Sequence, residues 1–454
     1  MDQPIGAPTA TTAAQHQKAH RTSVRAVAAS TIGSVLEYYD FFVFGTFSAL
    51  VFGHVFFPAD NAVVGGMLAM ATFAVGFVAR PLGGVILGHF GDRVGRKRVL
   101  LFTFMLTGLV TVLIGFLPTY AQVGIASPML LVLLRVLQGV GIGGEWGGAA
   151  LLAVEHAPAN RRSLYGSIVQ AGAPIGVLLS SGVVALLTAT LGMDALIAWG
   201  WRIPFLASSV LLMVGLFLRF KVEETPEFNE VKATKAEAKL PVVQAIMRFP
   251  KEIASSIFIH MSDTTLGLVQ GVFVLGYASG VLGMNPTIVL LANMFSSVCN
   301  LIITPIAGHF GDRFGQKRIL TVGLVLMGLW AFPMFWLIGT ATVWGLFTAT
   351  GVCGVLVGLL FSQQATLFAD MFHPAVRYSG MSMGFQVGTV IGGGFGPLIA
   401  QGLTAATGGA TWSVSTYILF VAILALLATQ LVKPRFGARA HGHGHIVAAP
   451  AHVR

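Results

Sequence analysis

Residues 88–100 read GHFGDRVGRKRVL, and residues 308–320 read GHFGDRFGQKRIL. Ten of the thirteen positions are identical, so the stretch is an internal repeat with an offset of 220 residues. Each copy follows the second apolar run of a group of six such runs. Two related halves around a central axis are typical of transporters. The duplicated motif therefore predicts a chain built from two similar halves.

Composition places the chain in a membrane. Of its 454 residues, 55% are hydrophobic and 10% are charged, whereas a soluble domain carries about a quarter charged residues. A helical crossing needs about 20 apolar residues, so the hydrophobic residues suffice for about twelve crossings. The apolar runs are long and continuous, which excludes the alternating pattern of an outer-membrane barrel.

The apolar runs predict an all-α membrane protein with twelve transmembrane helices in two pseudo-symmetric six-helix halves. We expect helices over residues 25–57, 62–89, 98–117, 128–155, 163–191, 201–220, 253–278, 286–309, 318–338, 342–370, 377–404 and 411–432. The same reading predicts five regions, namely a disordered tail (1–23), a first half (24–220), a charged connector (221–252), a second half (253–432) and a second disordered tail (433–454).

The basic residues indicate the orientation. Lys and Arg fall almost entirely in loops on one side of the predicted bundle, together with both tails. By the positive-inside rule this side is cytoplasmic, so both termini are expected there. The net charge of +10 is then a topology signal that also meets anionic lipid headgroups, and no nucleic-acid partner is expected.

The repeated motif is a candidate cytoplasmic gate. Its glycines allow two helices to approach, while its aspartate accepts hydrogen bonds at a helix start and pairs with guanidinium groups. The alternative is that the basic residues only fix topology. The candidate gate residues are Gly88, Asp92, Arg93, Gly95, Arg96, Lys97, Asp312, Arg313, Gly315 and Lys317.

Charges at membrane depth are costly and therefore mark functional sites. Glu37 and Asp40 lie three residues apart, on one face of the first helix, and Arg135 and Glu145 lie in the fourth. We expect Asp40 and Arg135 to form a pair that loosens when a proton arrives, which is what coupling requires. A permanent salt bridge between the two helices is the alternative. Candidate proton-coupling residues are Asp40, Arg135, Glu37 and Glu145.

A second cluster of Glu37, Arg80 and Glu145 is expected nearer the cytoplasm, either fastening helices or titrating. The fork of a buried arginine matches a substrate carboxylate, and the sequence does not choose between Arg80 and Arg135. His260 and Asp263 form a polar pair on the seventh helix that is either a binding site or packing. Candidate substrate-binding residues are Arg80, Arg135, Tyr39, Gln170, His260, Asp263, Gln364 and Gln386.

Several motifs resemble one family. The motif at 88–98 and the segment LRVLQGVG at 134–141 resemble signatures of the major facilitator superfamily. The segments LEYYDF (36–41), GFVARPLGG (76–84) and WGWRIPF (199–205) resemble its metabolite:proton symporter branch, and EHAP (155–158) resembles the shikimate-type carriers. The resemblance implies a multi-pass protein of the inner or plasma membrane that couples metabolite uptake to proton entry by alternating access.

The leading hypothesis is a proton-coupled symporter that imports a small organic acid, shikimate-like or another carboxylate. Alternatives are a proline/betaine-type osmoprotectant symporter and a passive facilitator or channel. No His-Glu-x-x-His pattern or nucleotide-binding glycine loop is present, so we expect no enzyme activity. We expect no cofactor besides the coupling proton, no metal, a small-molecule substrate and a functional monomer.

Overall fold

The computed structural model describes most of the chain. It covers residues 31–58, 62–94, 96–143, 146–155, 157–158, 160–220, 241–373 and 376–432. Helices dominate these ranges, and no strand occurs within them, which confirms the predicted all-α class. Both expected tails and most of the expected connector lie outside the described residues.

The N-terminal half contains six helical rods. The first covers residues 31–50 and is called helix 31–50; the short helix α2 (Phe52–Val55) follows it. The others are α3 (Ala62–Val94), α4 (Arg96–Gly115), α6 (Ala126–Ile142) continued by α7 (Trp146–Glu155), α8 (Arg162–Gln170) continued by α9 (Gly172–Ala195) and η1 (Leu196–Gly200), and α10 (Arg202–Phe220), with the short α5 (Tyr120–Val123) before α6.

The C-terminal half repeats this pattern. Its short first helix, α12 (Pro241–Arg248), lies in the segment expected as connector. Six rods follow, namely α13 (Pro250–Leu268) continued by η2 (Val269–Phe273) and α14 (Val274–Gly280), α15 (Pro286–Phe314), α16 (Gln316–Gly339), α17 (Val343–Met371), α18 (Arg377–Gly388) continued by η3 (Thr389–Gly394) and α19 (Gly396–Ala406), and α20 (Trp412–Leu431).

These rods suit a bilayer. In the part of the chain that the structure describes, eight helices are long and apolar enough to cross a membrane, and α4 and α6 contain shorter apolar stretches. Large hydrophobic side chains on the outside of the bundle, such as Trp336 and Leu427, are exposed. Such a surface fits lipid rather than water.

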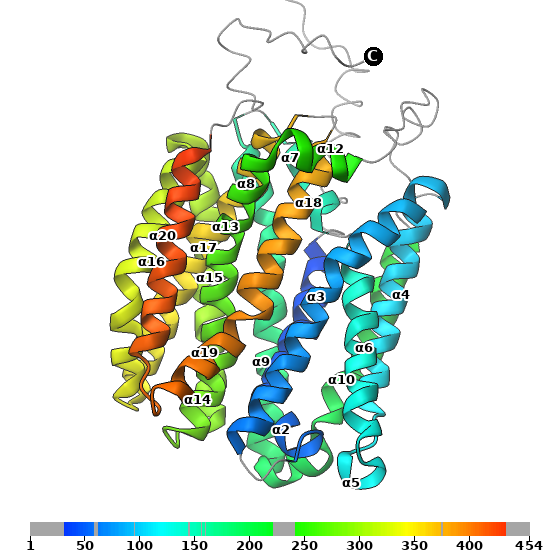
Figure 1. Cartoon of the computed structure of the whole chain (residues 1–454), viewed down its shortest axis with the longest axis vertical. Helices are drawn as coiled ribbons and strands as arrows, with labels where there is room; N and C mark the ends of the chain where they lie inside the picture. The colour runs from blue at the N-terminus through cyan, green and yellow to red at the C-terminus, as the bar shows by residue number, and fades with distance from the viewer. Residues whose placement is uncertain are drawn as a thin grey trace, which may run out of the picture.

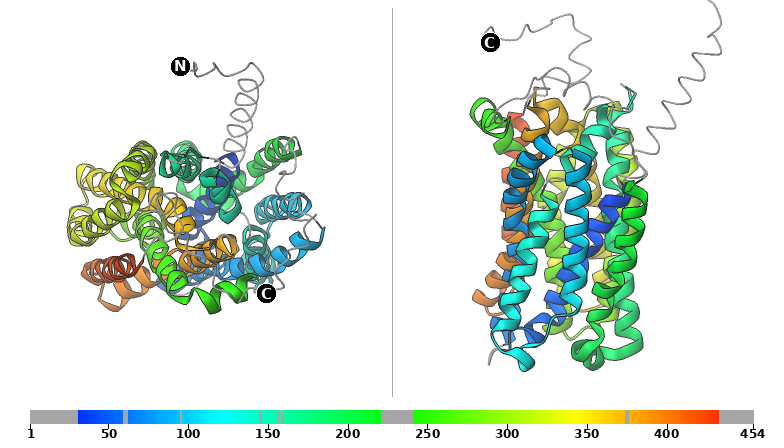
Figure 2. Two further views of the ribbon diagram at one scale, coloured as in Figure 1. Left: turned by 90° about the horizontal axis from the view of Figure 1, so that it is seen from above. Right: turned by 90° about the vertical axis from the view of Figure 1, so that its right-hand side faces the viewer.

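The two halves lie side by side. Figure 1 shows the helices of the first half, coloured from blue to green, beside those of the second, coloured from green to red, and the view from above in Figure 2 agrees. The halves meet where α8 and α9 pack on α15 and where α3 packs on η3 and α19. We call the end of the bundle with α7, α8 and α12 the motif end, because residues 308–320 lie there; α2, α5 and α14 lie at the opposite end.

Glycine brings two helices of the first half together. Within the expected helix over 128–155, α6 ends at Ile142 and α7 begins at Trp146, and residues 144–145 lie outside the described residues. A side chain on Gly143 would place its Cβ 2.1 Å from the Arg80 carbonyl oxygen, so only glycine lets α3 and α6 approach this closely. The glycine run in η3 forms a π-helical turn instead of a regular α-helix, and π-turns of this kind are frequent at functional sites.

Candidate functional site

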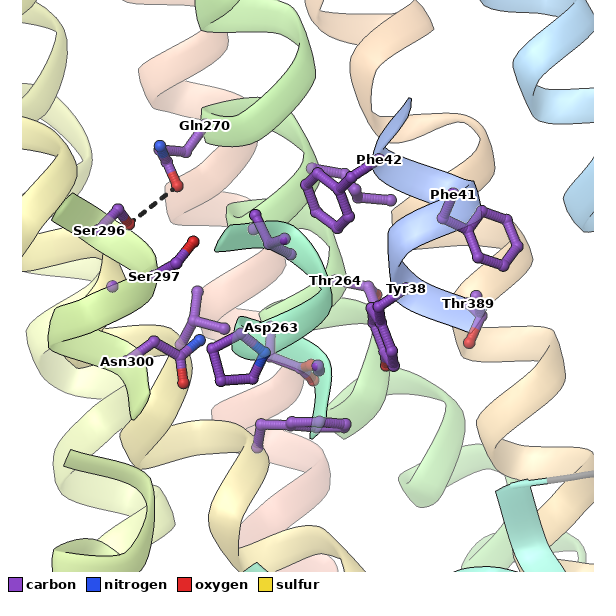
Figure 3. Close-up of a pocket in the computed structure, with 18 of the residues that line it drawn as sticks. Tyr38, Phe41, Phe42, Asp263, Thr264, Gln270, Ser296, Ser297, Asn300 and Thr389 are labelled. Atoms are coloured by element: carbon purple, nitrogen blue, oxygen red, sulfur yellow. Dashed lines mark hydrogen bonds between the residues drawn. The ribbon is translucent and has the colours of Figure 1, made fainter. Parts of the chain in front are cut away.

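A cavity lies between the two halves, and we call it the central cavity. One wall comes from helix 31–50, where Tyr38, Phe41 and Phe42 share a face because they are spaced by three and four residues. Figure 3 shows these three rings on one helix. Phe361 of α17 and Phe385 of α18 add further aromatic rings to the lining.

The opposite wall is polar and uncharged, and we call it the amide wall. Gln270 of η2 donates through Nε2 to Asn293 Oδ1 at 3.0 Å and accepts from Ser296 Oγ at 3.2 Å (Figure 3). Ser297 and Asn300 continue this face of α15 toward the motif end. The uncharged residues expected from the sequence do not include this wall. The available signal was the spacing of the four polar residues of α15 at i, i+3, i+4 and i+7, which places them on one helix face.

Arg80 brings a positive charge to the central cavity. It is the one Lys or Arg among the described lining residues. Its Nη2 lies 3.3 Å from Glu37 Oε1, and both side chains are largely buried. The guanidinium carbon lies 3.8 Å from the centre of the Phe41 ring, a cation–π contact that holds the charge in place. The expected meeting of Glu37 and Arg80 therefore occurs, while Glu145 lies outside the described residues.

Asp40 is buried and reaches Arg135 only through other side chains. Its carboxylate accepts from Thr111 Oγ1 at 2.9 Å and from Ser208 Oγ at 3.2 Å. Thr111 in turn accepts from Gln138 Nε2 at 2.8 Å, and Gln138 Oε1 accepts from Arg135 Nη1. The expected direct contact between Asp40 and Arg135 is thus corrected to a chain of hydrogen bonds.

Arg135 is fully buried beside the aromatic rings of its own half. Its guanidinium carbon lies 3.9 Å from the centre of the Phe44 ring, and Nη2 donates to the Phe73 carbonyl at 3.3 Å. A side chain on Gly76 would place its Cβ 2.5 Å from Arg135 Nη2, so this glycine makes room for the guanidinium. The cation does not line the central cavity.

A polar cluster lies in the second half. His260 contacts Gln364 Oε1 through Nδ1 and Thr389 Oγ1 through Nε2, both at 2.8 Å, and Gln364 donates to Asp263 Oδ1 at 2.6 Å. His260 Nδ1 also lies 3.3 Å from Asp263 Oδ1. The Phe385 ring stacks on the imidazole, with 3.8 Å between the ring centres. Asp263 and Thr389 line the central cavity, whereas His260 and Gln364 support them from behind.

The direction in which each side chain points from its helix decides which of the expected substrate residues line the central cavity. Arg80 and Asp263 line the central cavity. Six other side chains were expected at the cavity and lie at the right depth, but they do not line it. They are Arg135, Tyr39, Gln170, His260, Gln364 and Gln386. Depth does not determine rotation, because consecutive residues point about 100° apart around a helix.

Two of these side chains support contacts between helices. Gln170 accepts from Trp146 Nε1 at 3.0 Å, and the Trp146 ring stacks on Phe385 of the other half with 3.6 Å between the ring centres. Gln386 donates across the halves to the Gly143 carbonyl at 3.0 Å. The ring stacking of Trp146 on Phe385 and the hydrogen bond from Gln386 to Gly143 therefore join the two halves.

At the motif end two crossed ion pairs join the halves, and we call them the crossed latch. Arg162 Nη1 lies 2.7 Å from Asp370 Oδ1, and Arg377 Nη1 lies 3.1 Å from Glu155 Oε1. In each half the acid precedes the arginine by seven residues, and the two sets are offset by 215 residues. This weaker internal repeat was the available signal for the latch.

The second copy of the motif contributes one further contact between the halves. Asp312 accepts from the backbone N–H groups of Ser163 at 2.8 Å and Leu164 at 3.0 Å, at the start of α8. This satisfies donors that a helix start leaves free, and it places a negative charge at the positive end of the helix dipole. The expected role of this aspartate at a helix start is present in the geometry.

The structure describes only some of the other gate candidates. Lys317 donates to backbone carbonyls of Gln430 and Val432 in its own half, so its contact does not join the halves. Arg313 is exposed, and Gly315 ends α15 with φ of +94°. In the first copy of the motif, Gly95 and the side chains of Asp92, Arg93, Arg96 and Lys97 lie outside the described residues. Gly88 lies in α3.

The comparisons with known proteins agree with this architecture. A model described as Sugar (and other) transporter matches residues 26–255, and one described as Major Facilitator Superfamily matches residues 253–450. The shikimate transporter of Escherichia coli K12 is 38% identical over 412 residues, which are 90% of this chain and 94% of that protein. The proline/betaine transporter of the same organism is 31% identical over 422 residues, covering 90% and 83%.

A solved structure supports the fold. The crystal structure of a D-xylose-proton symporter matches with a TM-score of 0.70 and 19% identity, covering 90% of this chain and 98% of that one. These relatives are transporters rather than enzymes. The two halves, the cavity between them, the duplicated motif and these matches together show that this multi-pass membrane protein belongs to the Major Facilitator Superfamily.

Proposed function

We propose that the protein is a proton-coupled symporter that imports a small organic acid by alternating access. The observation that carries this proposal is Arg80, a buried cation at the wall of the central cavity. Its Nε has no hydrogen-bond partner among the residues that the structure describes. A guanidinium offers paired donors that match the two oxygens of a carboxylate, so an organic anion suits this wall.

The amide wall favours a substrate that also carries hydroxyl groups. Gln270, Asn293 and Asn300 present amide groups across the cavity from the aromatic wall. Amides both donate and accept hydrogen bonds, as hydroxyl groups do. A hydroxylated carboxylic acid such as shikimate would place its carboxylate at Arg80 and its hydroxyl groups on the amide wall.

Asp40 supports proton coupling. Its buried carboxylate has two hydroxyl partners and lies one hydrogen-bond chain away from Arg135. An ionised carboxylate at this depth is costly, and a bound proton removes the charge. The Asp40 carboxyl group thus has an ionised and a protonated state. A change between the conformations of alternating access can shift the balance between these two states. The coupling ion in this proposal is the proton, with no further cofactor.

The proposed orientation has the motif end and both termini in the cytoplasm of an inner or plasma membrane. The predicted topology puts the Lys- and Arg-rich loops at this end of the bundle, and such loops are typically cytoplasmic. The cavity is built from the two halves of one chain, so we propose that the monomer transports.

A zwitterionic osmoprotectant is the second candidate. Asp263 adds a carboxylate to the central cavity, and aromatic rings such as Tyr38 and Phe41 line it. A quaternary ammonium group binds to such rings by cation–π contacts. Betaine would then span Arg80 and Asp263.

Binding to purified protein separates the candidates. Thermal unfolding and intrinsic fluorescence are measured with shikimate, 2-oxoglutarate, citrate, proline and betaine at pH 5.5 and 7.5. We expect one carboxylate to raise the unfolding temperature, more at pH 5.5 than at pH 7.5. Preference for betaine or proline would support the second candidate, and equal carboxylate binding at both pH values would favour a passive facilitator.

A further inference from the structure

Helix 31–50 separates two cavities. Its aromatic face, Tyr38, Phe41 and Phe42, lines the central cavity, whereas Glu37 and Asp40 face the other way. These two carboxylates line a second cavity inside the N-terminal half, which we call the side cavity. Helices α4, α6 and α10 complete its wall with residues that include Phe104, Thr107, Ile142, Ser208 and Leu212.

The side cavity suits water and protons rather than a metabolite. Its volume is about 30 Å³, against about 100 Å³ for the central cavity. That space holds about one or two water molecules, provided that polar partners are present. The carboxylates of Glu37 and Asp40 and the hydroxyl groups of Thr107 and Ser208 supply such partners.

One ion pair connects the two cavities. Arg80 lines the central cavity but not the side cavity, and Glu37 lines the side cavity but not the central one. The 3.3 Å contact between Arg80 Nη2 and Glu37 Oε1 therefore bridges the partition. A ligand that accepts hydrogen bonds from Arg80 in the central cavity therefore weakens the ion pair between Arg80 and Glu37.

We propose that the side cavity is the proton-binding site for substrate recognition, and that Glu37 takes up one proton when a substrate carboxylate replaces it at Arg80. This inference rests on the proposed function. The proton passes from a hydronium ion in the side cavity to a carboxylate oxygen of Glu37 and leaves a water molecule. No other bond is formed or broken.

Charge balance gives the reason. Before binding, Arg80 and Glu37 together carry no net charge. An added monoanion would leave one buried negative charge uncompensated, and such charges are strongly destabilising. Protonation of Glu37 restores a neutral set made of Arg80, the substrate carboxylate and a neutral carboxylic acid. One proton per bound monocarboxylate is therefore the expected ratio.

Other charged and titratable groups around Glu37 bear on its protonation. Helices α4 and α10 contribute the hydroxyl groups of Thr111 and Ser208 near Asp40, and neither helix gives a charged side chain to the described lining of the side cavity. Asp40 keeps its own hydroxyl donors and its chain to Arg135, so substrate binding at Arg80 does not remove its partners. The surrounding groups are Arg80 of α3, Arg135 of α6, Asp263 of α13 across the central cavity, and Tyr38, Tyr39 and Asp40 of the same helix.

Proton uptake on binding tests the proposal. Purified protein in nanodiscs is mixed with shikimate in weakly buffered solution containing a pH-indicator dye, and the methyl ester of shikimate serves as a ligand without a carboxylate. We expect about one proton taken up per shikimate bound and none with the ester. Between pH 7 and 8, the Kd for shikimate should rise about tenfold, because one proton binds together with the ligand.

Variants assign the proton to one carboxyl group. Glu37→Gln should still bind shikimate, since the amide resembles the neutral acid, but should lose both the proton uptake and the pH dependence of Kd. Glu252→Gln, the same change outside both cavities, should keep both properties. Uptake that persists in Glu37→Gln and disappears in Asp40→Asn would overturn the assignment to Glu37.

The outcomes also separate this inference from the proposed function. Shikimate binding without proton uptake in the wild-type protein would overturn the role of Glu37 and leave the organic-acid proposal standing. Failure of shikimate, 2-oxoglutarate and citrate to bind at all would overturn the organic-acid proposal, and the inference with it.

Discussion

The two halves treat buried charge differently. The N-terminal half buries Glu37 with Arg80, and it links Asp40 to Arg135 through neutral side chains. The C-terminal half contributes one carboxylate to the central cavity, that of Asp263, which lies among amides and hydroxyl groups. Although the halves share a fold and a repeated motif, groups suited to proton exchange lie mainly in one half and groups suited to uncharged hydrogen bonding lie mainly in the other.

The largest expected effect tests the N-terminal half at Asp40. Asp40→Asn removes the carboxyl group that we propose binds the coupling proton, so we expect loss of accumulation against a gradient while exchange of substrate continues. Uptake and counterflow in proteoliposomes measure the two activities. Asp194→Asn, the same substitution at an exposed position, should accumulate substrate normally. Full accumulation by Asp40→Asn would contradict the proposed division between the halves.

Arg80→Gln comes next. The substitution removes the proposed carboxylate partner and leaves Glu37 without its cation, and loss of one member of a buried charge pair costs about 2–5 kcal/mol. We expect the Kd for shikimate to rise about 100-fold, measured by equilibrium binding. Arg318→Gln at the exposed surface is the matched control. An unchanged Kd in a folded Arg80→Gln protein would exclude this arginine as the anion site.

The amide wall should show a smaller effect. Gln270→Leu removes one hydrogen-bonding group from the wall, and a single hydrogen bond contributes about 0.5–1.5 kcal/mol. We expect the Kd for shikimate to rise about tenfold, with little change for a carboxylate that lacks hydroxyl groups. Equal losses for both ligands would indicate a general packing defect and would break the contrast between the two walls.

The smallest effect is expected at the motif end. Asp312→Asn weakens the cap on α8 that helps hold the halves together, and a cap of this kind contributes about 1 kcal/mol. We expect a several-fold increase in the labelling rate of a cysteine introduced at Ser163, with substrate Kd nearly unchanged. Arg318→Gln removes an exposed charge near the motif end and should not raise that rate. Slower labelling in Asp312→Asn would show that the cap does not favour closure.

Much of the fold was predictable because its signals are long. The lengths of the apolar runs predict the helical rods, and the repeat at 88–100 and 308–320 predicts two halves. The close approach of α3 and α6 at Gly143 is a feature of the backbones, and a hydropathy pattern does not show which two helices a glycine brings together. The motif residues of the first copy were expected as a gate, and their side chains lie outside the part that the structure describes.

The sequence predicts how deep each site residue lies in the bundle, but not the direction in which its side chain points. Glu37 and Arg80 meet as expected, because both are charged and lie at similar depth. Tyr39 was chosen where Tyr38 lines the cavity, since one residue turns the side chain away from it. The chain from Asp40 to Arg135 depends on two neutral side chains, Thr111 of α4 and Gln138 of α6. No sequence pattern links them to Asp40.

Transport driven by an imposed pH gradient is the direct test of proton-coupled symport. Proteoliposomes containing the wild-type protein are given radiolabelled shikimate, with the medium at pH 5.5 and the lumen at pH 7.5 or both at pH 7.5. We expect accumulation above the external concentration with the gradient and simple equilibration without it. Uptake that is the same under both conditions would contradict proton-coupled symport.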